Sequence, residues 1–576
     1  MTKSSGNDAI VDPNTYADPD PKRAASRRDV LGFLAAFGVV TPTASLISAI
    51  DAGIATAEAQ TAAGQPVPRL SVYTPNWPDM IELWRQLARD WAPLGVDLDV
   101  QQGTLDTFVS NIVAEQKLPH LGSMSWGGAP DRLDPDYFIS EMFHSRRAIK
   151  GGLNFGLYKS DEFDKAADSQ RQAMDPAERQ KLVRLAQELV VADSPSLILY
   201  HRDIIHAYNK KRFKGMKPIL GNGIGFPYMP LAYMDIEALQ PRKVLRLTSI
   251  YDIASLNPFQ TPEIYNSTTL RLIYATFVTR DEKAEVMPWA LASWNVVDNT
   301  TVDIVLRPNT KFHDGKPATV EDVKFTFDFI LKHKFPAMGR VTDALESASI
   351  TGDNTVRLKL KQPSAPFVAN VLGYAFLAPK HIWETIPANL ATPADWPNDK
   401  PVGSGPWKFV EWRKGEHIQF AANKDFYRPA KLDGFIAAVV PQMESMVGML
   451  ERGDSDMLAW NLDMTLGARI SQNPDLEVVR TPTHGQHEVR LNLSMAPCNN
   501  KAFRHALQHA TDRKKILDII FSGAGVVSHG APITPALEAW AVPSLKGYEP
   551  NIDKARAVLK DGGFTWNAQG KLMLPS

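Results

Sequence analysis

The sequence predicts an α/β protein built on a parallel sheet, because segments typical of strands and helices alternate along the chain. Residues 69–74 (RLSVYT) alternate apolar and polar side chains, as a strand does. Residues 79–95 then place apolar residues three and four positions apart, as an amphipathic helix does, and residues 96–102 (VDLDVQQ) form a second strand. A strand, a helix and a strand within about 35 residues make a βαβ unit, whose two strands run parallel.

A second helix and strand continue this pattern. The helix is expected over residues 175–195, where Asp175 caps the N-terminus and Pro176 occupies the first turn. Residues 196–201 (SLILYH) follow as a buried strand.

A short polar seam at residues 236–243 (IEALQPRK) precedes a new series of elements. Residues 243–249 read as a strand, and residues 301–331 contain a strand, a turn and a helix capped at Thr319. Residues 403–423 predict a β-hairpin, and residues 503–521 predict one long helix.

The C-terminal residues raise a question about strand pairing. A helix over residues 552–560 ends at Gly562 and Gly563, since glycine readily takes the left-handed position after a helix. Residues 571–576 (KLMLPS) then read as the start of a strand, and no partner follows them. Either these residues form a ragged end, or their partner lies elsewhere in the chain.

The N-terminus resembles a twin-arginine secretion signal. Residues 1–25 are polar, and Arg27 and Arg28 precede a moderately apolar run. Small residues offer a cleavage site after Ala59, and the alternative is an N-terminal membrane anchor. Because no cysteine follows the run, we expect an exported protein without a lipid anchor.

Composition argues against several kinds of site. The net charge of −1 offers no basic field for nucleic acid, and the lone Cys498 has no neighbouring zinc ligands. His484 and His487 are three residues apart, whereas a zinc-binding helix places its histidines four apart. Residues 221–225 (GNGIG) lack the flanking strand and helix of a nucleotide fingerprint, so we interpret them as a turn. No metal and no cofactor is expected.

Five stretches resemble, in order, the conserved blocks of one family. They are residues 272–328, with KFHDGKPATVEDV at their core, and residues 401–412, 423–435, 450–457 and 500–513. Together they resemble the periplasmic substrate-binding proteins of ABC importers for peptides, nickel chelates and related solutes, the family 5 or oligopeptide-binding class.

The remaining blocks of that family stand in front of these five. Residues 125–145, 153–166, 175–201 and 211–215 resemble its C-terminal part, and residues 552–564 resemble the helix that ordinarily precedes a strand like RLSVYT. The chain therefore resembles a circularly permuted member whose old termini are fused through residues 236–243. A rearranged gene carrying two fragments is the rival explanation, and a secretion signal before the displaced half favours a working protein.

The resemblance implies a periplasmic-binding-protein type II fold, circularly permuted, with two α/β lobes, a hinge and an extra subdomain. The expected domains are a leader with signal (1–59), the larger lobe (66–198, begun by 526–576), the return and fusion linker (199–242), the first lobe (243–285 and 403–525) and the subdomain (286–402).

The implied function is that of a soluble, periplasmic, monomeric binding protein without catalytic activity. It would capture peptide-like solutes between its lobes and deliver them to an ABC permease and ATPase complex in the inner membrane. The alternatives are a sensing module, binding of opines, oligosaccharides or nickel chelates, a hydrolase on the same lobes, and a non-functional rearranged fragment.

The resemblance also implies ligand-binding residues. Trp126 matches a tryptophan that precedes an aspartate pairing with the peptide ammonium group. When positions are counted back from Asp134, that aspartate corresponds to Asp131, and when they are counted forward from Trp126, the position corresponds to Ala129. The alternative interpretation of Asp131 is an aspartate that forms a turn or caps a helix.

Four further residues are candidates for the cleft. Tyr251 follows the first strand of the first lobe, and Trp460 follows the GDSD block. Arg490 and Asn492 lie near the strand expected to line the cleft, where Arg490 could meet a carboxylate.

Overall fold

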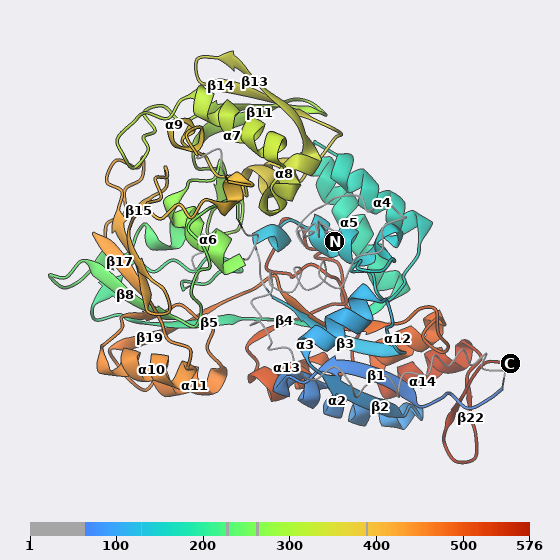
Figure 1. Ribbon diagram of the computed structural model, residues 1–576. Coiled ribbons are helices and arrows are strands. Elements are labelled where there is room, and N and C mark those ends of the chain that lie inside the picture. Colours follow the sequence, from blue (N-terminus) through green and yellow to red (C-terminus); the bar gives the residue numbers. More distant parts are fainter. Residues whose placement is uncertain (1–63, 128–129, 226–229, 261–263, 387–389) are drawn as a thin grey trace, which may run out of the picture.

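The computed structural model describes residues 64–127, 130–225, 230–260, 264–386 and 390–576. The predicted leader and signal, with Arg27, Arg28 and Ala59, lie outside the described residues. Figure 1 shows two α/β lobes and a smaller subdomain. In the part of the chain that the structure describes, no helix has the length and apolar character needed to cross a membrane.

One lobe, the six-stranded lobe, carries a sheet in the order β2-β1-β3-β20-β4-β21. β1 pairs in parallel with both β2 and β3, which confirms the predicted βαβ unit. The strands are β1 (Leu70–Pro75), β2 (Leu98–Gly103), β3 (Leu121–Trp126), β4 (Ser196–Arg202), β20 (Gln486–Leu491) and β21 (Gly525–Val527).

Some helices of this lobe pack against its sheet, and two others, at residues 161–172 and 176–193, pack mainly against each other. The helix after β1 buries Leu83, Trp84, Leu87 and Trp91 on one side, at the three- and four-residue spacing that predicted it. Asp175 caps α5 (Pro176–Asp193) as expected, accepting a hydrogen bond from the N–H of Glu178. The helices are α2 (Pro78–Trp91), α3 (Leu105–Phe108), α4 (Asp161–Gln172), α5 (Pro176–Asp193), α12 (Lys501–Ala510), α13 (Arg513–Phe521) and α14 (Ile552–Asp561).

The other lobe, the seven-stranded lobe, has the strand order β15-β16-β17-β8-β18-β5-β19. The predicted hairpin is β15 with β16, and β17, β8 and β18 run parallel. The strands are β5 (Ile204–Asn209), β8 (Val244–Ser249), β15 (Trp407–Arg413), β16 (His417–Ala422), β17 (Gly434–Val439), β18 (Met457–Leu458) and β19 (Leu476–Thr481), and the helices are α6 (Ile264–Ile273), α10 (Met443–Arg452) and α11 (Met464–Ile470).

The four-stranded subdomain is an antiparallel sheet in the order β11-β12-β14-β13, packed against one main helix. Thr319 caps that helix in a capping box with Asp322. The elements are β11 (Leu291–Asp298), β12 (Thr301–Leu306), α7 (Val320–His333), α8 (Gly339–Ala344), β13 (Leu345–Gly352), β14 (Thr355–Leu360) and α9 (Lys380–Trp383), beside a ribbon of β9 (Val278–Arg280) and β10 (Val286–Pro288).

Within the described residues, the chain passes between the two lobes at residues 202–204 and 482–485, which we call the hinge. β4 leads into β5 with one residue between them, and Figure 1 shows the two strands in line. The second passage joins β19 to β20. Since β5 pairs with β19 and β4 pairs with β20, the two passages lie side by side. The predicted two-lobed fold with crossing strands is confirmed.

The structure differs from the expected domain limits at two boundaries. β4 of the six-stranded lobe continues to Arg202, beyond the expected limit at residue 198. The sequence analysis assigned residues 403–525 to the first lobe, but β20 and the two helices after it belong to the six-stranded lobe. β19 and β20 read as two strands joined by a short loop, and that signal does not reveal that they belong to different sheets.

The single helix expected over residues 503–521 is wrong, because the structure has two helices there. Thr511 is extended, with φ −98° and ψ 115°, and ends α12. Asp512 then caps α13 by accepting a hydrogen bond from the N–H of Lys515. Asp512 was therefore a signal for a new helix N-terminus, although the helical pattern of apolar residues continues across it.

The C-terminal strand has one partner that directly precedes it and another at the start of the described chain. β23 (Leu572–Met573) pairs with β22 (Thr565–Trp566). On its other side, the N–H of Val67 donates to the carbonyl oxygen of Leu572 at 2.7 Å, and the N–H of Leu574 donates to that of Gln65 at 2.8 Å. The segment before β1 therefore completes the strand that the sequence left unpaired.

We predict that Leu572→Ala lowers the free energy of unfolding by about 2–5 kcal/mol, because Leu572 is fully buried where the two ends meet. Urea denaturation followed by circular dichroism measures the change. The exposed neighbour Lys571 is the control, and Lys571→Ala should stay within about 0.5 kcal/mol of the wild type. Equal stability of the two variants would contradict this packing.

Candidate functional site

The carboxyl ends of parallel strands from both lobes point toward the hinge. β3 ends at Trp126, which is paired with Gln486 directly after the second passage. β18 ends at Leu458, which is paired with Ala207 of β5, and β8 runs parallel to it. In open α/β sheets, ligands bind outside the carboxyl ends of the strands. The candidate site therefore lies between these two edges, beside the hinge.

Two predicted aromatic residues form a wall of this site on the seven-stranded lobe. Tyr251 follows β8, and Trp460 follows β18. Their ring centroids are 4.9 Å apart, with the planes inclined at 64°. Both side chains are half-buried, so part of each faces solvent. The structure thus brings together two residues that are far apart in the sequence.

On the six-stranded lobe, Trp126 is bonded to a buried carboxylate. Its indole N–H donates to Glu488 Oε1 at 2.8 Å, across 362 positions of sequence. Ser196 donates its hydroxyl to Glu488 Oε2 at 2.7 Å. Glu488 itself is fully buried, and the sequence analysis did not propose that it supports the site. Its strand β20 (QHEVRL) is mostly polar in sequence, so the pattern gave no signal that this carboxylate would be buried and would need such partners.

Arg490 supplies the positive charge that balances Glu488. Its Nη2 donates to Glu488 Oε1 at 2.7 Å, and its Nη1 donates to the carbonyl oxygen of Met142 at 2.8 Å. The guanidinium lies 4.6 Å from the ring centroid of Phe143 and 4.9 Å from that of Phe155. Only 1% of the Arg490 surface is exposed, so the side chain makes its contacts inside the lobe. Its contact with a ligand stays a prediction.

Asn492 follows the end of β20 that points away from the hinge. Its side-chain NH₂ donates to the carbonyl oxygen of Leu118 at 2.6 Å, and its Oδ1 accepts a hydrogen bond from the N–H of Ser494 at 3.1 Å. The structure therefore does not bring Asn492 to the edge that Trp126 occupies, and its role in binding also stays a prediction.

Asp131 lies in the short helix η3 (Pro130–Leu133), and only its backbone is among the described parts of the chain. Its neighbour Arg132 donates from Nη1 to the carbonyl oxygen of Gly127 at 2.6 Å. The Arg132 guanidinium also lies 5.1 Å from the ring centroid of Tyr137. The segment that carries Asp131 thus begins beside Trp126, at the hinge edge of the lobe.

A buried ion pair fixes this segment to α5. Asp134 accepts two hydrogen bonds from Arg179, at 2.6 and 3.0 Å, and both side chains are buried. Burial alone would raise the pKa of Asp134, but the Arg179 guanidinium holds that pKa below its ordinary value. Asp136, two residues further on, accepts hydrogen bonds from Ser140 at 2.6 Å and Gln170 at 2.5 Å.

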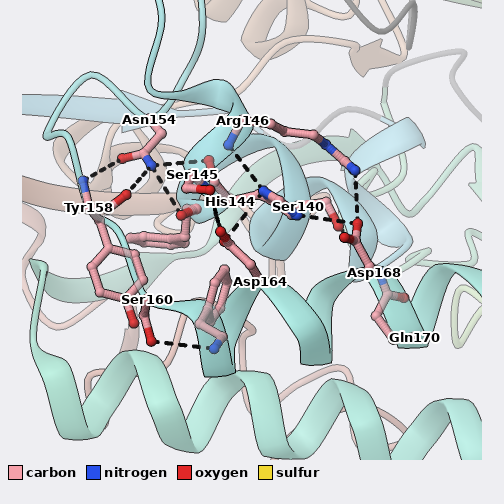
Figure 2. A network of polar contacts seen from close by, with 12 residues as sticks. Ser140, His144, Ser145, Arg146, Asn154, Tyr158, Ser160, Asp164, Asp168 and Gln170 are labelled. Carbon is pink, nitrogen blue, oxygen red and sulfur yellow. Dashed lines mark hydrogen bonds and ion pairs between the residues drawn. The ribbon is translucent and has the colours of Figure 1, made fainter.

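A second network, shown in Figure 2, fixes the following turn to α4. The N–H of Ser145 donates to Asp164 Oδ1 at 2.9 Å, and Arg146 Nη1 pairs with Asp168 Oδ1 at 2.8 Å. The His144 ring lies between the two carboxylates, with its nitrogens 3.3 Å from Asp164 and 3.2 Å from Asp168. Residues 130–147 are therefore held against two helices before any ligand binds.

The glycine-rich turn packs directly onto the hinge. Gly221 and Gly223 have φ of +76° and +68°, and the backbone bridge between Ile219 and Gly223 confirms the predicted turn. A Cβ at Gly221 would lie 2.1 Å from His484 Nδ1, and one at Gly223 would lie 2.3 Å from His206 Nδ1. Only glycine fits both the backbone conformation and this close approach.

Two histidines beside the hinge, His201 of β4 and His206 of β5, are buried. Burial lowers the pKa of His206 to about 3 and that of His201 to about 4, so both rings are neutral at physiological pH. Within the described ranges, no three His, Cys, Asp or Glu side chains gather as ligands for a metal ion.

Comparison with known proteins identifies relatives for part of the chain. Residues 285–575 match the family model described as bacterial extracellular solute-binding proteins, family 5 Middle. The oligopeptide-binding protein AppA of Bacillus subtilis is 30% identical over 300 residues, covering 51% of this chain and 54% of that protein. The nickel-binding periplasmic protein of Escherichia coli is 25% identical over 355 residues, covering 59% and 64%. The matches thus span between about half and two thirds of these relatives.

Two solved structures are also similar to this one. HbpA2 from Haemophilus parasuis has a TM-score of 0.48 and 23% identity, covering 56% of this chain and 67% of that one. AppA from Bacillus subtilis in complex with a nonapeptide has a TM-score of 0.41 and 25% identity, covering 57% and 66%.

We predict that Asp134→Asn lowers the free energy of unfolding at pH 7 by about 3 kcal/mol or more, because Arg179 would keep a buried charge without its counter-ion. The lowered pKa of Asp134 adds stability above its ordinary value of 3.8, and this stability is lost as the pH falls through the lower folded value. The difference between wild type and variant should therefore shrink in acid.

Urea denaturation between pH 7 and pH 3 measures this difference. Lys181→Met is the control, because the Lys181–Glu178 pair on the same helix is exposed and should contribute little. A difference between wild type and Asp134→Asn that stays constant with pH would contradict the assigned ion pair.

Proposed function

Since this chain belongs to the bacterial extracellular solute-binding proteins of family 5, we propose that it captures a solute between its lobes and delivers it to a membrane importer. The observation that carries the proposal is the pair Tyr251 and Trp460 at a strand edge that faces the edge of Trp126 across the hinge. Binding at micromolar affinity corresponds to about −8 kcal/mol. Only the part of this free energy that favours the closed state can close the lobes.

We favour a peptide-like solute. One relative is named for oligopeptides, another for nickel and a third, from Haemophilus influenzae, for heme. In our proposal the Asp131 carboxylate pairs with the solute's ammonium group, and the rings of Tyr251 and Trp460 contact its apolar parts. Opines, oligosaccharides and nickel chelates are the alternative solutes.

We also propose that the order of the chain is a circular permutation. Residues 65–67 run antiparallel beside residues 572–574, as the two arms of a hairpin would in an unpermuted chain. The proposed larger lobe, begun by residues 526–576 and continued by residues 66–198, is thus continuous in space across the two ends. The strands from β5 to β19 then belong to the other lobe and the subdomain (286–402), and β20 and β21 complete the six-stranded sheet.

The proposed fusion of the old termini is held in place by charge. In the linker, β7 (Glu237–Ala238) pairs with β6 (Phe213–Lys214). Arg242 Nη2 then lies 3.0 Å from Asp456 Oδ1, a carboxylate with no exposed surface. Arg212 and Arg246 contact the same carboxylate at 3.2 Å from either side of the linker. These contacts fix Arg212 and residues 237–246 against the seven-stranded lobe.

Export to the periplasm is part of the same proposal. Arg27 and Arg28 would direct the chain to twin-arginine export, and cleavage would follow Ala59. The partner would be an ABC permease and ATPase complex in the inner membrane, with the binding protein acting as a soluble monomer.

We predict that di- to pentapeptides raise the melting temperature of the protein starting at Gln60. A solute at a hundred times its dissociation constant stabilises the fold by about 2.7 kcal/mol, a clear shift in a thermal melt. The same screen includes chelated nickel, opines and oligosaccharides. A shift with one of these classes alone would replace the peptide proposal, and a melt that no solute moves would contradict solute capture.

Asp131→Ala tests the ammonium contact within that experiment. Loss of a buried charge partner costs about 2–5 kcal/mol, so peptides with a free amino terminus should lose their effect. Asp161→Ala, at the exposed start of α4, should leave the shift unchanged. Equal binding by wild type and Asp131→Ala would remove Asp131 from the site.

We predict that a rotated chain folds to the same structure. It would begin at Gln240, run to Ser576, continue through a short Gly/Ser linker to Gly64 and end at Leu239. Its melting temperature and solute profile should match those of the unrotated protein, because every described pairing is kept. A rotated chain without a cooperative melt would contradict the proposed permutation.

A further inference from the structure

The seven-stranded lobe contains a cavity between its sheet and α6, with a volume of about 50 Å³. Leu247 of β8, Phe420 of β16 and Phe435 of β17 line its floor, and Leu272 of α6 lines the opposite side. Tyr251 lines it as well. Because the same ring contacts Trp460, the cavity adjoins the aromatic wall of the candidate site.

The cavity offers mostly hydrocarbon surface, with Ser249 and Thr269 among its polar lining residues, and no available charge. The one carboxylate on its lining, that of Asp252, is already engaged in hydrogen bonds. Its Oδ1 accepts from the indole N–H of Trp412 at 2.8 Å, and its Oδ2 accepts from the N–H of Gly415 at 2.6 Å. A guest in the cavity is therefore held by apolar contact and gains no ion pair there.

We propose that this cavity receives a small aliphatic side group of the bound solute, next to Tyr251. The proposal rests on the proposed capture of a solute between the lobes, and it specifies part of that solute's chemistry. A water molecule needs about 10–15 Å³ of such volume, so the cavity has room for a group of a few carbon atoms and is too small for an indole ring. Valine-sized and leucine-sized groups fit this description.

Ala437 provides the test, because it lines the cavity from β17 and a larger side chain there would fill the space. Ala438, the next residue of the same strand, points to the opposite face of the sheet and supplies the matched control. The variants are Ala437→Leu and Ala438→Leu. If Ala437→Leu does not melt cooperatively, Ala437→Val is used in its place.

The measurement is calorimetric binding of triglycine and of tripeptides with one valine, leucine or tryptophan at each position. Burial of a leucine side chain should make the best leucine or valine peptide at least about 10-fold tighter than triglycine in the wild type. Ala437→Leu should reduce this gain, measured against triglycine in the same variant, to less than about 3-fold, whereas Ala438→Leu should keep the gain. The proposal is overturned if Ala437→Leu keeps the gain in affinity over triglycine, or if the wild type shows no such gain.

Failure of the proposed function would look different. If no peptide binds the wild type, peptide capture is wrong, and xenon then tests the cavity on its own, since dry apolar cavities bind this gas. A saturable ¹²⁹Xe NMR shift in the wild type and in Ala438→Leu, lost in Ala437→Leu, supports an apolar guest site. The absence of such a shift in the wild type overturns it.

Discussion

Two antiparallel passages of chain hold the protein together, and both pass from one sheet into the other. β5 pairs with β19 in the seven-stranded lobe, and β4 pairs with β20 in the six-stranded lobe. Each passage is short, so the lobes can move relative to each other only by changes in a few backbone angles. The same pairing directs the carboxyl ends of the parallel strands toward the hinge. The position of the candidate site is thus a consequence of how the lobes are joined.

Buried charges set the geometry around that site. Glu488 holds Trp126 and Arg490 from one side of the sheet, while Asp134 holds the segment after Trp126 against Arg179. Each charge has a partner and further hydrogen bonds, which is the condition under which an ion pair can be buried. These buried ion pairs therefore hold in position the residues that are proposed to contact the solute.

The sequence predicted much of this fold, because most elements carry local signals. The βαβ unit at residues 69–102 and the cap at Asp175 are confirmed. The break between α12 and α13 was missed because the helical pattern of apolar residues continues across Thr511. The change of sheet between β19 and β20 was missed because pairing with distant strands leaves no mark in a short loop.

The site was harder to predict, because it depends on contacts between distant residues. Tyr251 and Trp460 were each chosen from their place after a strand, and the structure adds that their rings touch. Glu488 bonds to Trp126, which is 362 positions away in the sequence, and Gly221 packs against His484, which is 263 positions away. Patterns in a single sequence do not report such contacts.

The division of the two sheets along the chain has a consequence for folding during synthesis. The strands of the seven-stranded lobe lie between Ile204 and Thr481, whereas the six-stranded lobe takes β1–β4 from before them and β20 and β21 from after them. The continuous lobe can form its sheet while the chain is still being made. The divided lobe must wait until β20, β21 and α14 have been made, since Val67 bonds to Leu572, which lies much later in the chain. Until then, the apolar face of β1 and α2 lacks its covering, and we expect this half to be the one that aggregates or engages chaperones.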